Sequence, residues 1–213
     1  MNNNVQQSNR PVDERLREIK KSFRLMMNGV TAQSMRDKGA FYKVNWGVPL
    51  PMLRKLAAEI GPDYDLSIAL WKENVRECKL LATMVMPAER MQPEVVDIWM
   101  EQTETLEVAE LAAFNLYRHL PYAADLAFRW IATDREIYQL CGFNVLGRLF
   151  MDGCEPNERA VNELIDQAQA ALQGHSVAVR KAALSCMSHF ADLGLVYERL
   201  AKSALKRVGI DFL

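Results

Sequence analysis

The sequence has no closely spaced cysteines. Cys78, Cys141, Cys154 and Cys186 are far apart, no C-x-x-C motif occurs, and three of the four fall within apolar helical patterns. The three histidines also lack the spacing of metal ligands. These absences argue against a disulfide framework and against a metal site. They favour buried free thiols in a reducing compartment.

A charge excess and long apolar runs are missing too. Lys and Arg total 26 against 27 Asp and Glu, so the net charge is −1 and no global positive field draws the protein to nucleic acid. No apolar run reaches the roughly 18 residues of a membrane helix, and the first ten residues are polar. We expect a cytoplasmic protein without a membrane partner, with residues 1–10 disordered and a single domain over 11–213.

Glycine-rich phosphate loops, G-x-S-x-G elbows and Cys–His nucleophile signatures are absent as well, so the sequence indicates no cofactor. Alternating β-branched residues do not occur, and almost every segment has the apolar period of a helix. Proline and glycine separate these segments. The pattern predicts an all-α protein with helices at about 12–28, 31–38, 51–60, 65–73, 75–86, 93–102, 106–119, 122–132, 135–151, 157–172, 176–192 and 195–208.

One segment, NWGVPLPMLRKLAAEIG from Asn45 to Gly61, joins a stiff loop to a helix. Gly47 permits a bend, and Pro49 and Pro51 fix the backbone around Leu50. The helix begins near Pro51, where a missing N–H costs nothing. The two basic residues Arg54 and Lys55 face away from its apolar side.

Tryptophan recurs at the ends of three helices. Trp71, Trp99 and Trp130 are each followed by a polar turn and then by another helix. A helix pair cannot bury its apolar face alone, so such pairs stack. We therefore predict an α-α superhelix, a solenoid of HEAT or armadillo kind. The alternative is an irregular helical bundle in which the tryptophans recur by chance.

In a solenoid, the second helix of each pair commonly lines the inner curve. These helices carry cations at comparable positions, and evenly spaced cations suit a phosphate backbone. The alternative is a solvated face of mixed charge, with Glu107 and Glu110 neutralising Arg118. The candidate DNA-binding residues are Arg76, Lys79, Arg118, Arg148, Arg180 and Lys181.

The segment from Asn45 onward, with ALWKENVRECKLLATMVM after it, resembles the DNA alkylation repair family of HEAT-like proteins, the AlkD type. That family has G-V-x-x-P-x-L-R-x-L-A-K here, then a helix ending in L-W, a polar turn and E-x-[KR]-x-x-A. VAVRKAALSCMSHF resembles a third family block. The matching residues are Gly47, Val48, Pro51, Leu53, Arg54, Leu56, Ala57, Leu70, Trp71, Glu77, Lys79 and Ala82.

The resemblance implies a C-shaped solenoid whose basic concave face holds duplex DNA. Active members of the family excise cationic bases alkylated at ring nitrogens. A carboxylate and aromatic faces stabilise the oxocarbenium sugar that develops in this reaction. By this resemblance Glu110 is the first candidate for the catalytic carboxylate, and Glu107 is the second.

The sequence departs from the family at its aromatic positions. Leu106 replaces the aromatic of the W-D-x-x-D block, Ser185 stands where the family has a Trp, and only Tyr138 keeps a ring. Losing these rings removes on the order of a few kcal/mol of cation stabilisation, which reduces turnover by several powers of ten. We expect a DNA glycosylase whose activity is weakened or lost. The alternatives are a non-catalytic scaffold for protein partners and a protein that recognises DNA structure without excising bases.

Overall fold

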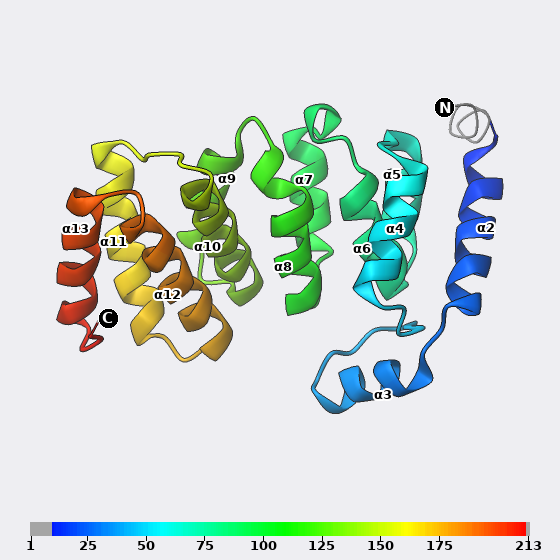
Figure 1. Ribbon diagram of the computed structural model, residues 1–213, viewed down its shortest axis with the longest axis horizontal. Coiled ribbons are helices and arrows are strands. Elements are labelled where there is room, and N and C mark those ends of the chain that lie inside the picture. Colours follow the sequence, from blue (N-terminus) through cyan, green and yellow to red (C-terminus); the bar gives the residue numbers. More distant parts are fainter. Residues whose placement is uncertain (1–9, 212–213) are drawn as a thin grey trace. The chain divides into compact units, whose positions relative to one another are not determined.

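The computed structural model describes residues 10–211 (Figure 1). The segment expected to be disordered, residues 1–10, falls outside the described residues except for Arg10, which pairs with Glu14 and Glu18. Within the described part, the chain is helix and loop apart from one isolated parallel β-bridge between Val44 and Val75. The all-α prediction is confirmed. None of the described helices is long and apolar enough to cross a membrane.

The described helices begin and end close to the predicted positions. The α-helices are α2 Val12–Leu25, α3 Gly29–Asp37, α4 Leu50–Ile60, α5 Tyr64–Lys72, α6 Arg76–Val85, α7 Pro93–Glu101, α8 Leu106–Asn115, α9 Ala123–Ile131, α10 Glu136–Met151, α11 Glu158–Gln173, α12 Val177–Ala191 and α13 Leu195–Arg207; two short 3-10 helices are η1 Ala88–Arg90 and η2 Tyr117–His119.

The observed helix α8 differs most from its predicted range, 106–119. It ends at Asn115, because Leu116 has φ −131° and ψ −61°, outside the helical region. The chain continues as η2, and the buried Tyr117 ring packs edge-on against Trp130 at 5.2 Å.

The chain divides into two compact units, one ending at Leu116 and the other beginning at Tyr117. The single domain over 11–213 stays a prediction. In the first unit, α6 contacts both α4 and α8, so these three helices form one layer. Trp71 of α5 and Trp99 of α7 stack at 4.1 Å with an interplanar angle of 3°. The recurring tryptophans therefore serve contacts between repeats in this unit.

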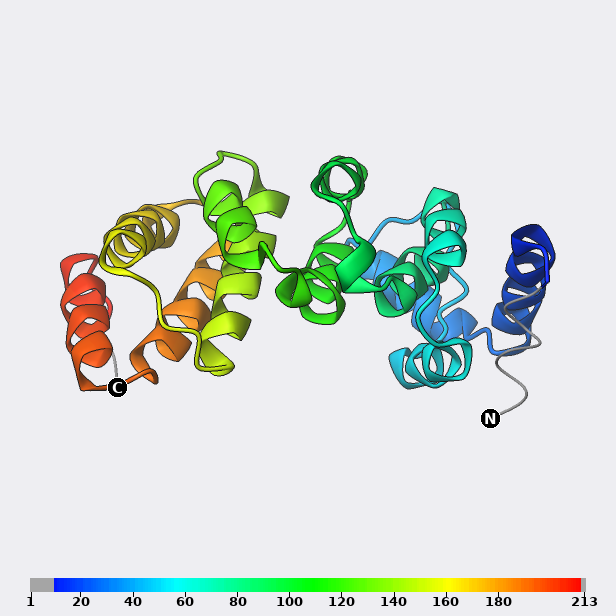
Figure 2. The same cartoon turned by 90° about the horizontal axis from the view of Figure 1, so that it is seen from above.

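In the second unit, α10 contacts both α9 and α12. Figure 2 shows α9 and α11 on one side of α10 and α12, which is the two-layer arrangement of stacked helix pairs. Cys141 and Cys186 are buried in this unit, as Cys78 is in the first, while Cys154 is exposed. Each cysteine is free, so the prediction of free thiols is confirmed, and three of the four are buried.

The close approach of α9 and α10 depends on Gly142. A Cβ at this position would lie 2.7 Å from Ile131 Cγ2 and 2.8 Å from the Ala127 carbonyl oxygen. The second of these is a backbone atom that cannot move aside, so a side chain here forces the two helices apart.

Replacing Gly142 by alanine is expected to lower the free energy of unfolding by about 1–3 kcal/mol, the usual cost of overpacking. Gly147→Ala on the same helix is the matched control. Its Cβ would meet Cys186 Cα at 3.4 Å, an ordinary contact. Urea denaturation of both variants measures the difference. Equal stability of Gly142→Ala and the unsubstituted protein would contradict the tight α9–α10 contact.

Candidate nucleic-acid interface

The loop before α4 is fixed by two adjacent buried side chains at the start of α6. Glu77 accepts hydrogen bonds from the backbone N–H groups of Trp46 (3.3 Å) and Val48 (3.2 Å). The Arg76 guanidinium donates to the Val48 carbonyl oxygen at 3.2 Å, and the Arg76 backbone N–H donates to the Val44 carbonyl oxygen at 3.0 Å. The loop is therefore an anchored part of the first unit.

Arg76 also connects α6 to α8. Its Nε and one terminal nitrogen donate to the two carboxylate oxygens of Glu107, at 2.9 and 2.6 Å. The Tyr42 hydroxyl donates to the same carboxylate and lies 2.9 Å from Thr105 Oγ1. Only 1% of Arg76 is exposed. Its guanidinium is therefore occupied by hydrogen bonds within the protein.

Glu107 belongs to the same cluster and is half-buried. Burial opposes its ionisation, but the hydrogen bonds from Arg76 and Tyr42 outweigh that effect and lower the pKa of Glu107. Its carboxylate is held by donors on both oxygens, which suits it to orient Arg76 rather than to take up a proton. The sequence predicted Arg76 at a phosphate and Glu107 as a second catalytic candidate. The structure pairs the two side chains with each other, with Arg76 buried and Glu107 half-buried, so our proposed interface uses neither.

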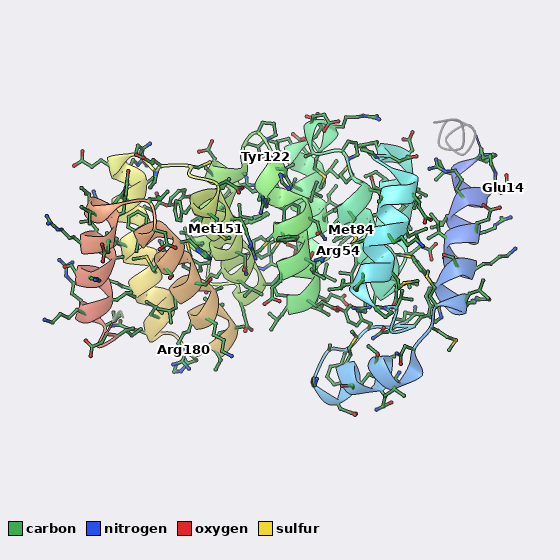
Figure 3. All side chains as sticks on the ribbon, in the orientation of Figure 1. Glu14, Arg54, Met84, Tyr122, Met151 and Arg180 are labelled. Carbon is green, nitrogen blue, oxygen red and sulfur yellow. The ribbon has the colours of Figure 1, made fainter. Side chains whose placement is uncertain are left out.

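Glu110 lies on α8 one turn beyond Glu107 and is exposed. Desolvation and then the Glu107 charge raise the pKa of Glu110. Phe114, one further turn along the same face, is 38% exposed, and the Arg54 guanidinium lies 5.9 Å from its ring centroid. Arg54, labelled in Figure 3, extends from α4. The α4–α6–α8 layer thus presents a carboxylate, an aromatic ring and a cation together.

Lys79 is half-buried, with its Nζ 4.3 Å from the centroid of the Trp71 ring. Desolvation lowers its pKa, while the Glu104 charge acts in the opposite direction. Lys79 and Glu104 line a pocket of about 430 Å³ that also includes Phe41 and Tyr42. Lys79 therefore contributes a positive charge to this pocket.

In the second unit, Arg180 and Lys181 lie in the first turns of α12 and are exposed (Figure 3 labels Arg180). Within the described residues, neither side chain has a carboxylate partner within ion-pair distance. Ser185, where the family has a Trp, is exposed one turn beyond Lys181. This part of α12 is a polar, cationic surface.

The other candidates of the second unit are less exposed. Arg118 pairs with Asp152 at 3.2 Å, and Arg148 on α10 is half-buried with one nitrogen 3.5 Å from Met151 Sδ. The Tyr138 ring, the aromatic that the resemblance retains, packs against Trp130 at 6.3 Å. The Arg135 guanidinium lies 4.1 Å from the centroid of the Tyr138 ring.

Sequence reasoning missed Tyr42 and Phe114 as parts of these clusters. Phe114 sits in an apolar run that is typical of a repeat interface, so only its spacing of four residues from Glu110 indicated an exposed position. Tyr42 lies in a loop 65 residues before its partner Glu107, and nothing in the sequence pointed to that contact. The described residues contain no cluster of His, Cys, Asp or Glu that could hold a metal ion.

Stacked helix pairs with polar clusters on one helical layer define a HEAT-like helical repeat protein, as predicted. Residues 19–192 match the family model described as DNA alkylation repair enzyme, so the chain belongs to that family. Among solved structures, it is similar to one described as "A new family of proteins related to the HEAT-like repeat DNA glycosylases with affinity for branched DNA structures". The TM-score is 0.80 at 16% identity, over 92% of this chain and 84% of that one. No curated protein matches the chain.

Proposed function

We propose that this protein binds DNA through the phosphate backbone, and that it prefers branched DNA to a linear duplex. Membership of the DNA alkylation repair family supports DNA as the partner. The preference is inferred from the similar structure, whose protein is described as having affinity for branched DNA. Backbone contacts carry little sequence information, so recognition of this kind responds to the shape of the DNA.

The observation that carries the proposal is the cationic start of α12. Arg180 and Lys181 are exposed side by side, without a carboxylate partner among the described residues. They lie near the helix N-terminus, where the dipole also favours an anion. Arg118 and Arg148 belong to the same unit and are secondary candidates, and Lys79 and Arg54 are the candidates in the first unit.

The test is the double variant Arg180→Glu/Lys181→Glu, measured by fluorescence anisotropy with a labelled linear duplex and a labelled four-way junction. Loss of two phosphate contacts is expected to weaken binding about tenfold or more and to lower the salt slope by about 1.8. Arg199→Glu/Lys206→Glu on α13 is the matched control, because it changes the same charge at two other exposed positions.

Two results would count against this function. Equal weakening in the control would show an effect of net charge rather than a site on α12. Absence of DNA binding by the unsubstituted protein, even at low salt, would favour the alternative of a scaffold for protein partners.

A second candidate function is excision of cationic alkylated bases, with Glu110 as the carboxylate. The exposed Glu110 carboxylate and the partly exposed Phe114 ring on one face favour it, since both groups stabilise positive charge. Glu110→Gln is expected to abolish release of a methylated purine from duplex DNA, while DNA affinity stays within about twofold because no phosphate contact is lost. Unchanged excision would remove Glu110 from the mechanism.

A further inference from the structure

The first unit carries a second cationic surface, on α2, that shares no residue with the Glu110 cluster. A groove of about 440 Å³ follows this helix, and its opposite wall includes Glu73, which directly follows α5. Four basic side chains line it at positions i, i+3, i+4 and i+7, which is one face of a helix. They are Arg17, Lys20, Lys21 and Arg24.

The basic residues of α2 are paired with carboxylates on some faces of the helix and not on others. Arg10 pairs with Glu14 and Glu18 along one side of the helix. Arg15 pairs with Asp63 at 2.6 Å. The cations of those faces are therefore already matched by carboxylates within the protein, and a surplus of positive charge is left only in the groove.

Within the groove, two carboxylates face four cations. Glu73 forms an ion pair with Lys20, with the Lys20 Nζ 2.6 Å from Glu73 Oε2. Asp13 lies in the first turn of α2, where the helix dipole favours its negative charge. Arg17, Lys21 and Arg24 have no carboxylate within ion-pair distance among the described residues, and all three are exposed.

These three cations suit a phosphate backbone in spacing as well as in charge. Arg17 and Arg24 are seven residues apart, which is about 10 Å along a helix. One strand of duplex DNA presents a phosphate about every 3.4 Å of axis, so such a row spans about three phosphates. A straight row on a helix fits a regular array of anions better than a single small anion, which calls for converging donors.

We propose that the α2 groove binds the phosphate backbone of a second arm of branched DNA. This inference rests on the proposed DNA-binding function and adds a surface to it. α2 contacts α5, whereas Glu110 and Phe114 lie on the α4–α6–α8 layer, so the two surfaces belong to different parts of the first unit. A linear duplex has no further arm to place in the groove, whereas a junction has one.

The test compares Arg17→Glu/Lys21→Glu/Arg24→Glu with Arg199→Glu/Lys206→Glu/Arg207→Glu on α13, a control with the same change of net charge at three exposed positions. Binding is measured by anisotropy with a four-way junction and with a linear duplex of the same arm sequence, between about 50 and 200 mM salt. Thermal unfolding followed by circular dichroism establishes that both triple variants are folded.

We expect the α2 variant to bind the junction about tenfold or more weakly, with a salt slope lower by about 2.7, and to bind the linear duplex almost unchanged. Unchanged junction binding, equal losses on both DNAs, or an equal loss in the α13 control would each overturn the groove proposal. A different result would overturn the proposed DNA-binding function itself: the unsubstituted protein would bind neither the junction nor the linear duplex. Should the triple variant unfold, Arg17→Gln/Lys21→Gln gives the same comparison with a smaller expected loss.

Discussion

Arg76→Ala is expected to lower the free energy of unfolding by about 3–5 kcal/mol, the usual cost of removing one partner of a buried ion pair. The variant removes the guanidinium that donates two hydrogen bonds to the Glu107 carboxylate. It also removes the hydrogen bond to the Val48 carbonyl oxygen. Glu77 also loses a cation, 3.2 Å away. Three acceptors therefore lose a donor at once.

Chemical denaturation measures this effect, with Arg10→Ala as the control. Arg10 also pairs with two carboxylates, but on the surface, where such pairs contribute little. The decrease in unfolding free energy caused by Arg76→Ala is expected to be smaller at low pH. The pKa of Glu107 is lowered in the folded protein, so the ion pair stabilises fully above the unfolded pKa and less as the pH falls through the folded pKa. A small loss at neutral pH, equal to that of Arg10→Ala, would contradict the interior role of Arg76.

Gly47→Ala is the second change with a large expected effect, about 2–5 kcal/mol of destabilisation. Gly47 has φ +70°, which costs other residues about 1–2 kcal/mol. A Cβ there would also lie 2.2 Å from the Asn28 carbonyl oxygen and 2.8 Å from the Ala32 nitrogen. These two atoms form a hydrogen bond in the first turn of α3. The substitution therefore strains the loop and displaces the start of a helix.

Gly61→Ala separates the two causes. Gly61 has φ +75°, but nothing lies within 4 Å of its Cβ position, so it carries only the backbone cost. The difference in unfolding free energy between the two variants isolates the clash with α3. If both alanine variants lose the same stability, the contact between the loop and α3 contributes nothing.

The helices could be predicted because their evidence is local. Apolar residues at helical spacing, with prolines and glycines between them, place most helix ends within one to three residues of the observed ones. Gly47 was expected to permit a bend, and its positive φ confirms this. The atom that leaves no room for a Cβ there is the carbonyl oxygen of Asn28, the N-cap of α3, and helical spacing gives no sign of this contact.

The role of Arg76 could not be predicted for a related reason. A charged residue at the start of a helix usually faces solvent, and helical spacing assigns a face without saying what covers it. α6 lies between α4 and α8 and also packs on α5, so almost all of its sides are covered. Arg76 has its partner Glu107 31 residues further on. Arg180 and Lys181 are on α12, where the predicted polar face is exposed.

The distribution of the cysteines has a practical consequence for studies in solution. Burial raises the pKa of Cys78 to about 12 and raises the pKa values of Cys141 and Cys186 as well, so these thiols resist alkylation in the folded protein. Cys154, in the loop after α10, is exposed. The natural sequence thus offers one reactive thiol to which a maleimide dye can be attached, and fluorescence from the second unit can be followed without engineering any cysteine out.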